Sequence, residues 1–523
     1  MSIKWRSYTD GILGVSFRHD ADGVSLIHRK AIGRIRLAGG MRMTSAIETT
    51  IRSAVKKGVI ALAGFNRARL KGPDGPHPFL SGVHTPMREE LTLESLEVEG
   101  TIPEELDGRY IRIGPNPAAA PNPGAYHWFT GDGMVHGVRL KGGRALWYRN
   151  RWIRSRAVSR ARGLPDAPGP RNALSDTVNT NVIAHAGASW ALVEAGGFPV
   201  RISEELETIA HDPFGGTLGD SFSAHPHLDP ETGELHAICY SGQDPTRVRH
   251  VVVDAGGRVR RDEPVAVADG PSIHDCMITP HYVIILDLPV TFSMKRLIAG
   301  YAFPYAWNPA HRARVGLLPR EGRGEDVIWC DVDPCYVFHP CNGFETPDGR
   351  VILDVCAHTR MFETSTMGPD SAASPFERWT IDPASRRVQR EVIDPDAQEF
   401  PRPNEARIGK PYRFAYTVGL PGGGAQAGFV ASSRLYKHDL ERRTREVHDF
   451  GPDHMTGEFV FVASRRAAAE DDGWLMGYVI NTQTDKTDFV ILRAQDISAP
   501  PQAVVRLPHR IPPGFHGNWA PSA

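Results

Sequence analysis

The sequence has few cysteines, no surplus of either charge and no long apolar run, and each absence excludes a class of protein. Its six cysteines are never spaced CxxC, which argues against a disulfide scaffold and a zinc ribbon. Sixty basic residues balance 61 acidic ones, so the charge gives no support for nucleic-acid binding. No run of 18 apolar residues occurs, so no membrane-spanning helix is expected. The simplest interpretation is a cytoplasmic protein.

The N-terminal region divides into two segments. Residues 1–42 carry charges every few positions and no apolar stretch of signal-peptide length, so we expect a poorly structured extension or one that precedes the natural start. From Ser45 to Leu70, apolar residues recur at three- and four-residue steps, so the segment 43–76 is predicted to be an amphipathic helix. Two interpretations remain open, peripheral attachment to a membrane surface and packing on the protein. We favour packing, because Gly58 and Gly64 weaken a free-standing helix.

Beyond residue 76, short alternating or apolar stretches follow one another with turn signals between them. The 52 glycines and 42 prolines punctuate the chain densely without making it low-complexity, which favours many short strands. We expect residues 77–523 to form a single all-β domain. A β-propeller would absorb this many strands in one closed body, whereas a pair of β-sandwiches stays open as an alternative because no blade motif repeats.

Four of the 22 histidines stand in settings that differ from the rest. They are His225 in SAHPHLDP, His274 in PSIHDCM, His339 in VFHPCN and His516 in GFHGNW. They lie too far apart in the chain for a local metal motif. Inner strands of a propeller converge on one axis, so imidazoles from several blades can meet there at one ion. Imidazole suits several transition metals, and an ordinary hydrogen-bonded role is the alternative for each ring.

The segments LDGRYIRIGPNP, YHWFTGDGMVHGVRL, DTVNTNV, SAHPHLDPETGEL, SIHDCMITP, VFHPCNGFE, EDDGWLMGYV and RIPPGFHGNW span residues 106–519 in this order. Together they closely resemble the carotenoid cleavage oxygenase family. The resemblance implies a seven-bladed β-propeller with a helical and loop cap over the iron face. It also implies a non-haem Fe(2+) held by His225, His274, His339 and His516.

The resemblance extends to residues behind and beside the metal. It carries three glutamates, Glu194, Glu399 and Glu470, onto positions where they would accept hydrogen bonds from His274, His339 and His516. His225 would have no carboxylate. Thr180 would face the iron and bias where O2 binds. Taken singly, each of these residues also has an ordinary strand or loop role as its alternative.

The implied reaction is cleavage of a C=C double bond by O2 into two carbonyl products, without an external reductant. An apolar substrate would need an apolar approach, and the stretch 291–307 supplies Phe303 and Trp307 as candidates for a lip over a tunnel or a buried cap. Tyr126, in the YHWF motif, is a third candidate for substrate binding. No nucleic acid and no obligate protein partner are expected.

Relatives act either on carotenoids and apocarotenoids or on hydroxylated stilbenes and phenylpropenes. The stilbene group uses a tyrosine, here Tyr126, together with a nearby lysine. The lysine would belong in the segment NRWIRSRAVSRARG at 150–163, whose basic residues are all arginines. Arginine stabilises a phenolate but cannot act as a base in place of lysine. We therefore prefer a carotenoid or apocarotenoid substrate, with the aromatic alkene as the alternative and a non-catalytic ligand-binding propeller as a third hypothesis.

Overall fold

The computed structural model describes residues 17–20, 23–26, 45–172, 175–371, 373–421 and 432–522, and the chain separates into two units, Met1–Leu62 and Ala63–Ala523. In the first unit, β1 (Phe17–Asp20) and β2 (Gly23–Leu26) pair antiparallel. The rest of the prediction for residues 1–42 lies outside the described residues. No helix within the described ranges is long and apolar enough to cross a bilayer.

Helix α1 (Ser45–Arg67) lies within the segment 43–76 that was predicted to be helical, and it ends before that segment does. Gly72 and Pro73 follow, and both residue types oppose continuation of a helix. In the second unit, the side chains of Asn66 and Arg67 donate hydrogen bonds to the carbonyls of Ile298 and Gly300, at 2.7 and 2.9 Å. The last turn of α1 therefore packs against α3 (Met294–Ala299).

The second unit is an all-β, propeller-like fold built mainly from antiparallel sheets. Three sheets have four strands each, in the spatial orders β11 (Thr208–His211), β10 (Val200–Ile202), β9 (Ala188–Leu192), β8 (Asn181–His185); β12 (His227–Leu228), β13 (Leu235–Cys239), β14 (Arg247–Val253), β15 (Val259–Ala266); and β26 (Gln398–Pro403), β27 (Phe414–Gly419), β28 (Arg434–Asp439), β29 (Thr444–Asp449).

A larger sheet has eight strands in two antiparallel halves. The halves are β16 (Cys276–Ile278), β17 (Tyr282–Asp287), β20 (Arg314–Pro319), β21 (Ile328–Asp331), and β22 (Tyr336–Glu345), β23 (Val351–His358), β24 (Phe376–Asp382), β25 (Arg387–Asp394). They join only through one parallel pair, Asp331 with Arg387, between β21 and β25. β18 (Val290–Phe292) and β19 (Tyr305–Trp307) form a separate hairpin, and α3 lies in the chain between its two strands.

Strands from the two ends of this unit complete the last two sheets. One sheet has the order β3 (Thr92–Leu93), β7 (Arg144–Trp152), β6 (Gly133–Lys141), β5 (Gly108–Pro115), β35 (Gly517–Pro521). The other has the order β30 (His454–Thr456), β32 (Gly473–Asn481), β33 (Lys486–Arg493), β34 (Ala503–Leu507), β4 (Glu97–Gly100). In this second sheet, β31 (Val460–Ala463) also pairs with β32. The C-terminal β35 thus pairs with β5, and the early β4 pairs with β34. These pairings connect the two ends of the domain and close it.

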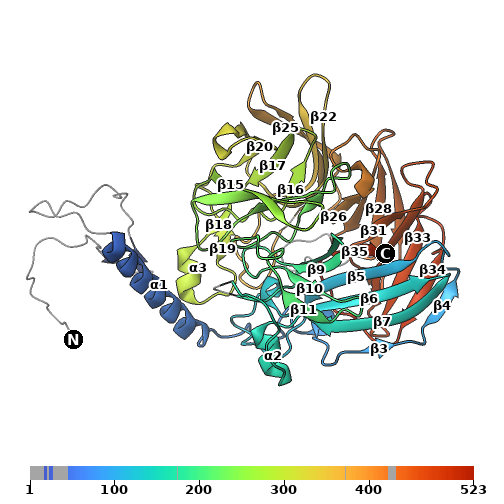
Figure 1. The fold of residues 1–523 in the computed structure, drawn as a ribbon, viewed down its shortest axis with the longest axis horizontal. Helices are drawn as coiled ribbons and strands as arrows, with labels where there is room; N and C mark the ends of the chain where they lie inside the picture. The colour runs from blue at the N-terminus through green and yellow to red at the C-terminus, as the bar shows by residue number, and fades with distance from the viewer. Residues whose placement is uncertain are drawn as a thin grey trace, which may run out of the picture. The chain divides into compact units, whose positions relative to one another are not determined.

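The sheets of the second unit are arranged around a centre toward which β16, β26, β31 and β35 lie in Figure 1. Contacts between inner strands support this arrangement, since β16 lies against β22, β22 against β26, and β35 against β8. Each of these strands pairs with a single neighbour within its sheet and so lies at an edge. Side chains at these inner edges are therefore brought close together.

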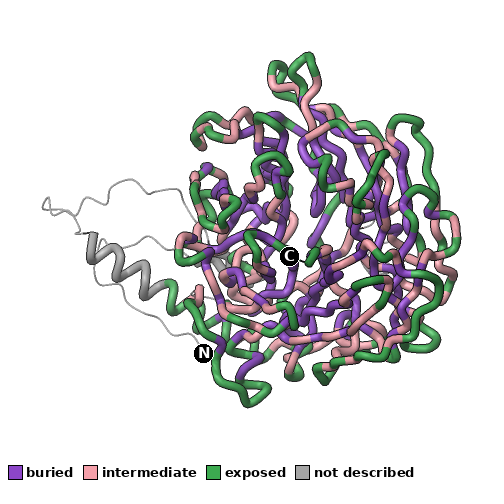
Figure 2. The backbone as a smooth tube through the Cα atoms, turned by 45° about the vertical axis from the view of Figure 1, so that its right-hand side comes forward, coloured by how far each residue is buried: buried purple, intermediate pink, exposed green. Residues whose placement is uncertain are grey.

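Burial follows the position of each strand within its sheet. Every residue of β5 and β23 is buried, whereas β15 and β25 mostly alternate between exposed and intermediate positions. Figure 2 shows buried segments gathered inside this unit and exposed ones mostly at its periphery. Strands covered on both faces are buried at every position, while outer strands keep a period of two. The outer strands face solvent, and the inner strands form the core.

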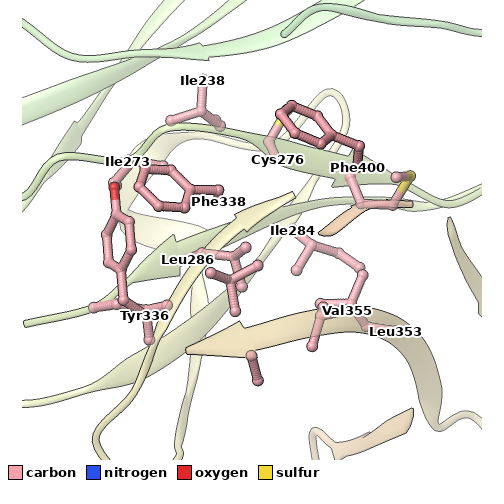
Figure 3. Packing of buried hydrophobic residues seen from close by; sticks show 14 of the residues in the cluster. Ile238, Ile273, Cys276, Ile284, Leu286, Tyr336, Phe338, Leu353, Val355 and Phe400 are labelled. Atoms are coloured by element: carbon pink, nitrogen blue, oxygen red, sulfur yellow. The ribbon is translucent and has the colours of Figure 1, made fainter. Parts of the chain in front are cut away.

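The largest apolar cluster fills the region between the β16–β25 sheet and its neighbours (Figure 3). Tyr336 and Phe338 of β22 belong to it, and their rings meet edge to face at 4.9 Å between ring centroids.

Tight hairpins hold neighbouring strands in register. Gly142 and Gly143 connect β6 to β7 with φ values of 54° and 71°, the left-handed conformation that a two-residue hairpin of this type requires.

Candidate metal centre

Four histidines from separate strands meet inside the second unit. His225 precedes β12, His274 precedes β16, His339 lies within β22, and His516 precedes β35. All four are buried, and one ring nitrogen from each lies within 4.8 Å of the others. The structure therefore brings together the four residues that the sequence analysis singled out.

Local irregularities of the inner strands aim these rings. The pairing of β22 with β23 shifts register between Val337 and Pro340, and His339 falls in this stretch. Such a bulge re-aims a side chain away from the regular alternation. The backbone N–H of His516 donates to the carbonyl of Thr180 at 3.2 Å, which ties the start of β35 to the start of β8.

The ring nitrogens are close enough to bind one ion. Nε2 of His274 lies 3.2 Å from Nε2 of His339. The ring centroid of His225 lies 4.4 Å from that of His274 and 4.5 Å from that of His516. Nε2 of His225 is buried and has no hydrogen-bond partner among the described residues. Because buried polar atoms seldom stay unpartnered, this nitrogen is suited to a ligand at the centre of the group.

Two of the predicted glutamates lie behind their predicted histidines. Nδ1 of His339 donates to Oε2 of Glu399 at 2.6 Å, and both side chains are buried. Nδ1 of His274 lies 2.8 Å from Oε2 of Glu194, although the N–H direction does not meet hydrogen-bond geometry. The bond to Glu399 fixes the ring of His339 and leaves its Nε2 directed at a metal.

The third predicted pairing is wrong, because the carboxylate behind His516 is that of Glu458. Nδ1 of His516 donates to Oε1 of Glu458 at 3.0 Å. Glu470 instead accepts the backbone N–H groups of Arg413 and Phe414, both at 2.8 Å, and so anchors the start of β27. One signal could have identified Glu458: it is the only charged residue of GEFVFVA, otherwise an apolar strand sequence, and a fully buried charge needs a partner.

No glutamate was expected behind His225, and the structure places an aspartate nearby. Oδ2 of Asp275 lies 3.7 Å from Nδ1 of His225, which is beyond hydrogen-bond distance. Oδ1 of the same carboxylate accepts a hydrogen bond from Nε2 of His227 at 2.8 Å. His225 is therefore the least constrained of the four rings by carboxylates.

Glu399 and Glu458 stay ionised although burial by itself raises the pKa of a carboxyl group. Burial raises the pKa of Glu458, but Arg402 and His516 outweigh it and lower that pKa to about 2. Burial likewise acts against ionised Glu399, and His339 overcomes this and drives its pKa far below the usual value. Burial, with the neighbouring His274, holds the pKa of His225 well below its usual value, so that ring is neutral.

This donor set fits a first-row transition metal. Neutral imidazoles that face carboxylates with Nδ1 present a free Nε2 lone pair, which is the ligating form of histidine. Imidazole suits Fe, Zn, Cu and Ni, so the residues accommodate Fe(II) without selecting it by ligand type alone. Buried carboxylates also compensate the charge of a divalent cation.

Thr180 lies next to this group, immediately before β8. Its side chain is buried, and its hydroxyl donates to Oδ1 of Asn179 at 2.9 Å. Asn179 is in turn held by the carbonyls of Phe129 and Gly131, at 2.9 and 2.7 Å. These bonds fix the Thr180 side chain and connect it to the TGDG segment.

Aromatic rings connect the histidines to the β18–α3–β19 hairpin. Phe338 contacts His274 at 5.0 Å between ring centroids, and Phe129 contacts Phe338 at 5.9 Å. Phe303 lies 5.6 Å from Phe129 and stacks on His127 at 4.5 Å. A continuous aromatic path thus leads from His274 to the predicted cap residue Phe303.

The other two predicted substrate residues lie farther along this lining. The backbone N–H of Trp307 donates to the carbonyl of Phe362, whose ring contacts Phe303 at 4.8 Å. Tyr126 is buried, and its ring contacts His77 at 5.5 Å. Burial raises the pKa of Tyr126 strongly, so its phenol stays protonated. Phe303 and Trp307 therefore share a neighbour, and Tyr126 belongs to another part of the same apolar cluster.

A cavity of about 430 Å³ adjoins the imidazoles, and its wall mixes polar and apolar side chains. Three of the histidines, His225, His339 and His516, line it together with Asp275, Arg402 and Glu458. The three aromatic residues predicted to bind substrate are not among the residues of its wall. This cavity is distinct in composition from the aromatic lining.

Comparison with known proteins identifies relatives over most of the chain. The profile of the RPE65 family, described as retinal pigment epithelial membrane protein, matches residues 84–521. A carotenoid cleavage oxygenase of Mycobacterium tuberculosis is 43% identical over 495 residues, which cover 86% of this chain and 98% of the relative. An apocarotenoid-15,15'-oxygenase of Synechocystis is 30% identical, with 81% of this chain and 92% of that protein covered.

Solved structures share the fold. Cobalt-substituted Synechocystis ACO superposes with a TM-score of 0.74 at 29% identity, covering 84% of this chain and 97% of that chain. The lignostilbene dioxygenase of Pseudomonas brassicacearum superposes with a TM-score of 0.77 at 26% identity, covering 86% and 99%.

Proposed function

This chain belongs to the carotenoid cleavage oxygenase family, and we propose that it is an Fe(II) dioxygenase that cleaves a C=C double bond of a carotenoid or apocarotenoid. Its relatives carry the names of cleavage oxygenases, and the enzyme is accordingly an oxidoreductase that incorporates O2. The observation that carries the proposal is the meeting of His225, His274, His339 and His516 with carboxylates behind the rings. Fe(II) held by these four imidazoles would supply the O2 activation that alkene cleavage needs.

Residues around the four histidines would orient the rings and limit the space beside the ion. Glu399 and Glu458 hold the Nδ1 protons of His339 and His516, which keeps both rings in the ligating tautomer. Glu194 would do the same for His274 after a small reorientation. Thr180, fixed by Asn179, would limit the space beside the ion and thus bias where O2 enters.

The aromatic lining would bind the substrate. Phe338, Phe129 and Phe303 present flat apolar surfaces from the histidines outward, which suits a conjugated polyene and excludes water. Trp307 would contribute near the outer end, where it is only partly buried. Tyr126 would contribute as a neutral phenol rather than as a phenolate.

Two observations favour the polyene over a hydroxylated stilbene or phenylpropene. Segment 150–163 has no lysine, and its Arg154 and Arg162 are engaged with the carbonyl of Pro165 and with Trp152. The carotenoid cleavage oxygenase of Mycobacterium tuberculosis also has a higher identity, 43%, than the lignostilbene dioxygenase, 26%. The likeness of that dioxygenase in fold keeps the aromatic alkene as the second candidate.

We also propose that the all-β domain is a propeller of seven blades. The eight-stranded sheet is joined by a single parallel pair, so we treat its halves as two blades. With the three four-stranded sheets and the two sheets that contain β35 and β4, this makes seven blades in residues 77–523.

Peripheral membrane contact remains a separate part of the proposal. Met294 on α3 is 47% exposed beside the proposed lip. Arg296 is committed to the carbonyls of Tyr305, Phe362 and Ser365, at 2.9, 2.9 and 3.0 Å, so its guanidinium serves the cap. Co-sedimentation with liposomes, for the wild type and Met294→Ser, tests whether the apolar contact is used.

The deciding experiment incubates iron-loaded protein in parallel with β-apocarotenals and with resveratrol, and analyses the products by mass spectrometry. We expect two carbonyl fragments from an apocarotenal. Cleavage of resveratrol alone would establish the aromatic-alkene activity instead. Iron-free protein after metal supply, with no cleavage of either compound, would leave the non-catalytic ligand-binding propeller.

A further inference from the structure

Glu399 holds more than one histidine. Its Oε2 accepts from Nδ1 of His339 at 2.6 Å and from the backbone N–H of Phe400 at 2.6 Å. Its Oε1 accepts from Nε2 of His358 at 2.8 Å. Glu399 and His358 are both fully buried. The carboxylate is therefore fixed at both oxygens, and one of its three donors is a side chain outside the four-histidine group.

Strand pairing explains how His358 reaches this position. It is the last residue of β23, opposite Tyr336 of β22, and His339 follows on the irregular stretch of the same β22. β26, which carries Glu399, lies against both β22 and β23. Phe338 packs between the two histidines, with its ring 5.4 Å from His358 and 5.9 Å from His339. The three strands thus hold a His339–Glu399–His358 row.

Glu458 shows the same arrangement with a different donor. Its Oε1 accepts from His516, and its Oε2 accepts from the backbone N–H of Gly517 at 2.9 Å. Both carboxylates therefore have one oxygen on a histidine of the metal group and the other on a second donor. For Glu458 that donor belongs to the main chain, whereas for Glu399 it is a replaceable side chain.

We propose that His358 is a positioning residue of the metal centre, which fixes Glu399 by donating to its Oε1 and thereby holds His339 in its ligating orientation. This inference rests on the proposed function, since it assigns His339 as a ligand. Without the donor, Oε1 would lose its hydrogen bond in the buried interior, and the carboxylate would rotate or bind water. His339 would then lose the fixed direction of its Nε2.

The test measures metal binding directly, with Co(II) as a spectroscopic probe; the relative of known structure named above was obtained in a cobalt-substituted form. Apo-protein is titrated with Co(II), and affinity and visible absorption bands are recorded for four variants. His358→Leu and His358→Met remove the donor at similar volume. His358→Gln keeps an N–H donor near the position of Nε2. His250→Leu is the matched control, since His250 is equally buried but bonds only His236 and Arg261.

We expect the donor-free variants to bind Co(II) about 10- to 100-fold more weakly and with shifted bands. His358→Gln should stay within about threefold of the wild type, because its amide restores the donor. His250→Leu should lower thermal stability and leave affinity and bands unchanged. Unchanged Co(II) affinity and bands in His358→Leu, or equal damage in His358→Gln, would overturn the proposal.

Two further outcomes separate this proposal from the one before it. If the wild type binds no Co(II) or iron, the proposed function itself fails. If neither donor-free variant folds while His250→Leu does, the role of His358 is structural, and the positioning proposal is overturned although the four-histidine site stands.

Discussion

Nδ1 of His516 donates a hydrogen bond to Oε1 of Glu458 across 3.0 Å, in a part of the protein where both side chains are almost fully buried. The two residues are far apart in the sequence, and β35 and the segment before β31 bring them together. The same carboxylate accepts the N–H of Gly517. Glu458 thus fixes both the ring and the backbone at the start of the last strand.

Glu458→Gln is therefore expected to weaken metal binding by about 10- to 100-fold and to lower cleavage activity with it. An amide oxygen accepts the ring N–H more weakly than a carboxylate does. Metal content after dialysis, measured by mass spectrometry, checks the prediction. Glu470→Gln is the matched control, because its amide oxygen still accepts the N–H groups of Arg413 and Phe414. Equal metal loss in both variants would contradict the assignment.

His339→Ala should abolish stoichiometric iron binding. The substitution removes one of four ligands and leaves Glu399 buried without its nearest partner, so we also expect lower stability. Iron per chain and the urea unfolding midpoint measure the two effects separately. A variant that retained one iron per chain and full turnover would show that His339 is no ligand.

The unfolding free energy of the apo-protein should fall as pH decreases from about 6.5 toward 4. Burial lowers the pKa of His236 from 6.5 to about 4, so the unfolded state binds more protons than the folded state between these values. His236→Gln removes this difference, and its stability should depend less steeply on pH, by at most about 1.4 kcal/mol per pH unit. Urea unfolding of both proteins at pH 8, 6 and 5 tests this. Parallel pH profiles would refute it.

Phe303→Leu should raise KM for an apocarotenal more than Trp307→Leu does. The ring of Phe303 is buried within the aromatic lining and stacks on His127, whereas Trp307 is partly exposed. Loss of a ring contact in the lining reduces substrate binding without removing a metal ligand. Steady-state kinetics together with iron content distinguishes the two effects. A larger effect for Trp307→Leu would place the binding surface farther out.

The sequence supported the four histidines better than it supported the residues around them. Each of His225, His274, His339 and His516 stands in a short segment that resembles the family's own, and that resemblance assigned it as a ligand. Glu470 was a plausible partner for His516 only by alignment with the family. Its neighbours Asp471 and Asp472 belong to a turn, and no local pattern distinguishes an acidic turn residue from a buried acceptor.

The roles of Glu458 and His358 depended on strand pairing. Glu458 lies two residues before the apolar strand β31, and His358 is the last residue of β23, so each resembles an ordinary strand end. Whether such a side chain meets a metal-binding ring depends on which inner edges lie side by side and on the bulge in β22. A shift of one residue would turn the side chain to the other face.

By itself, the sequence determined the all-β class, because strand alternation and turn residues are local properties. Its short motifs resemble those of one family, and that resemblance assigned the four imidazoles. Only the tertiary structure decided which carboxylate stands behind His516 and that His358 reaches Glu399. Those contacts join residues from different sheets, and their distances are set by how the inner strands meet rather than by any spacing along the chain.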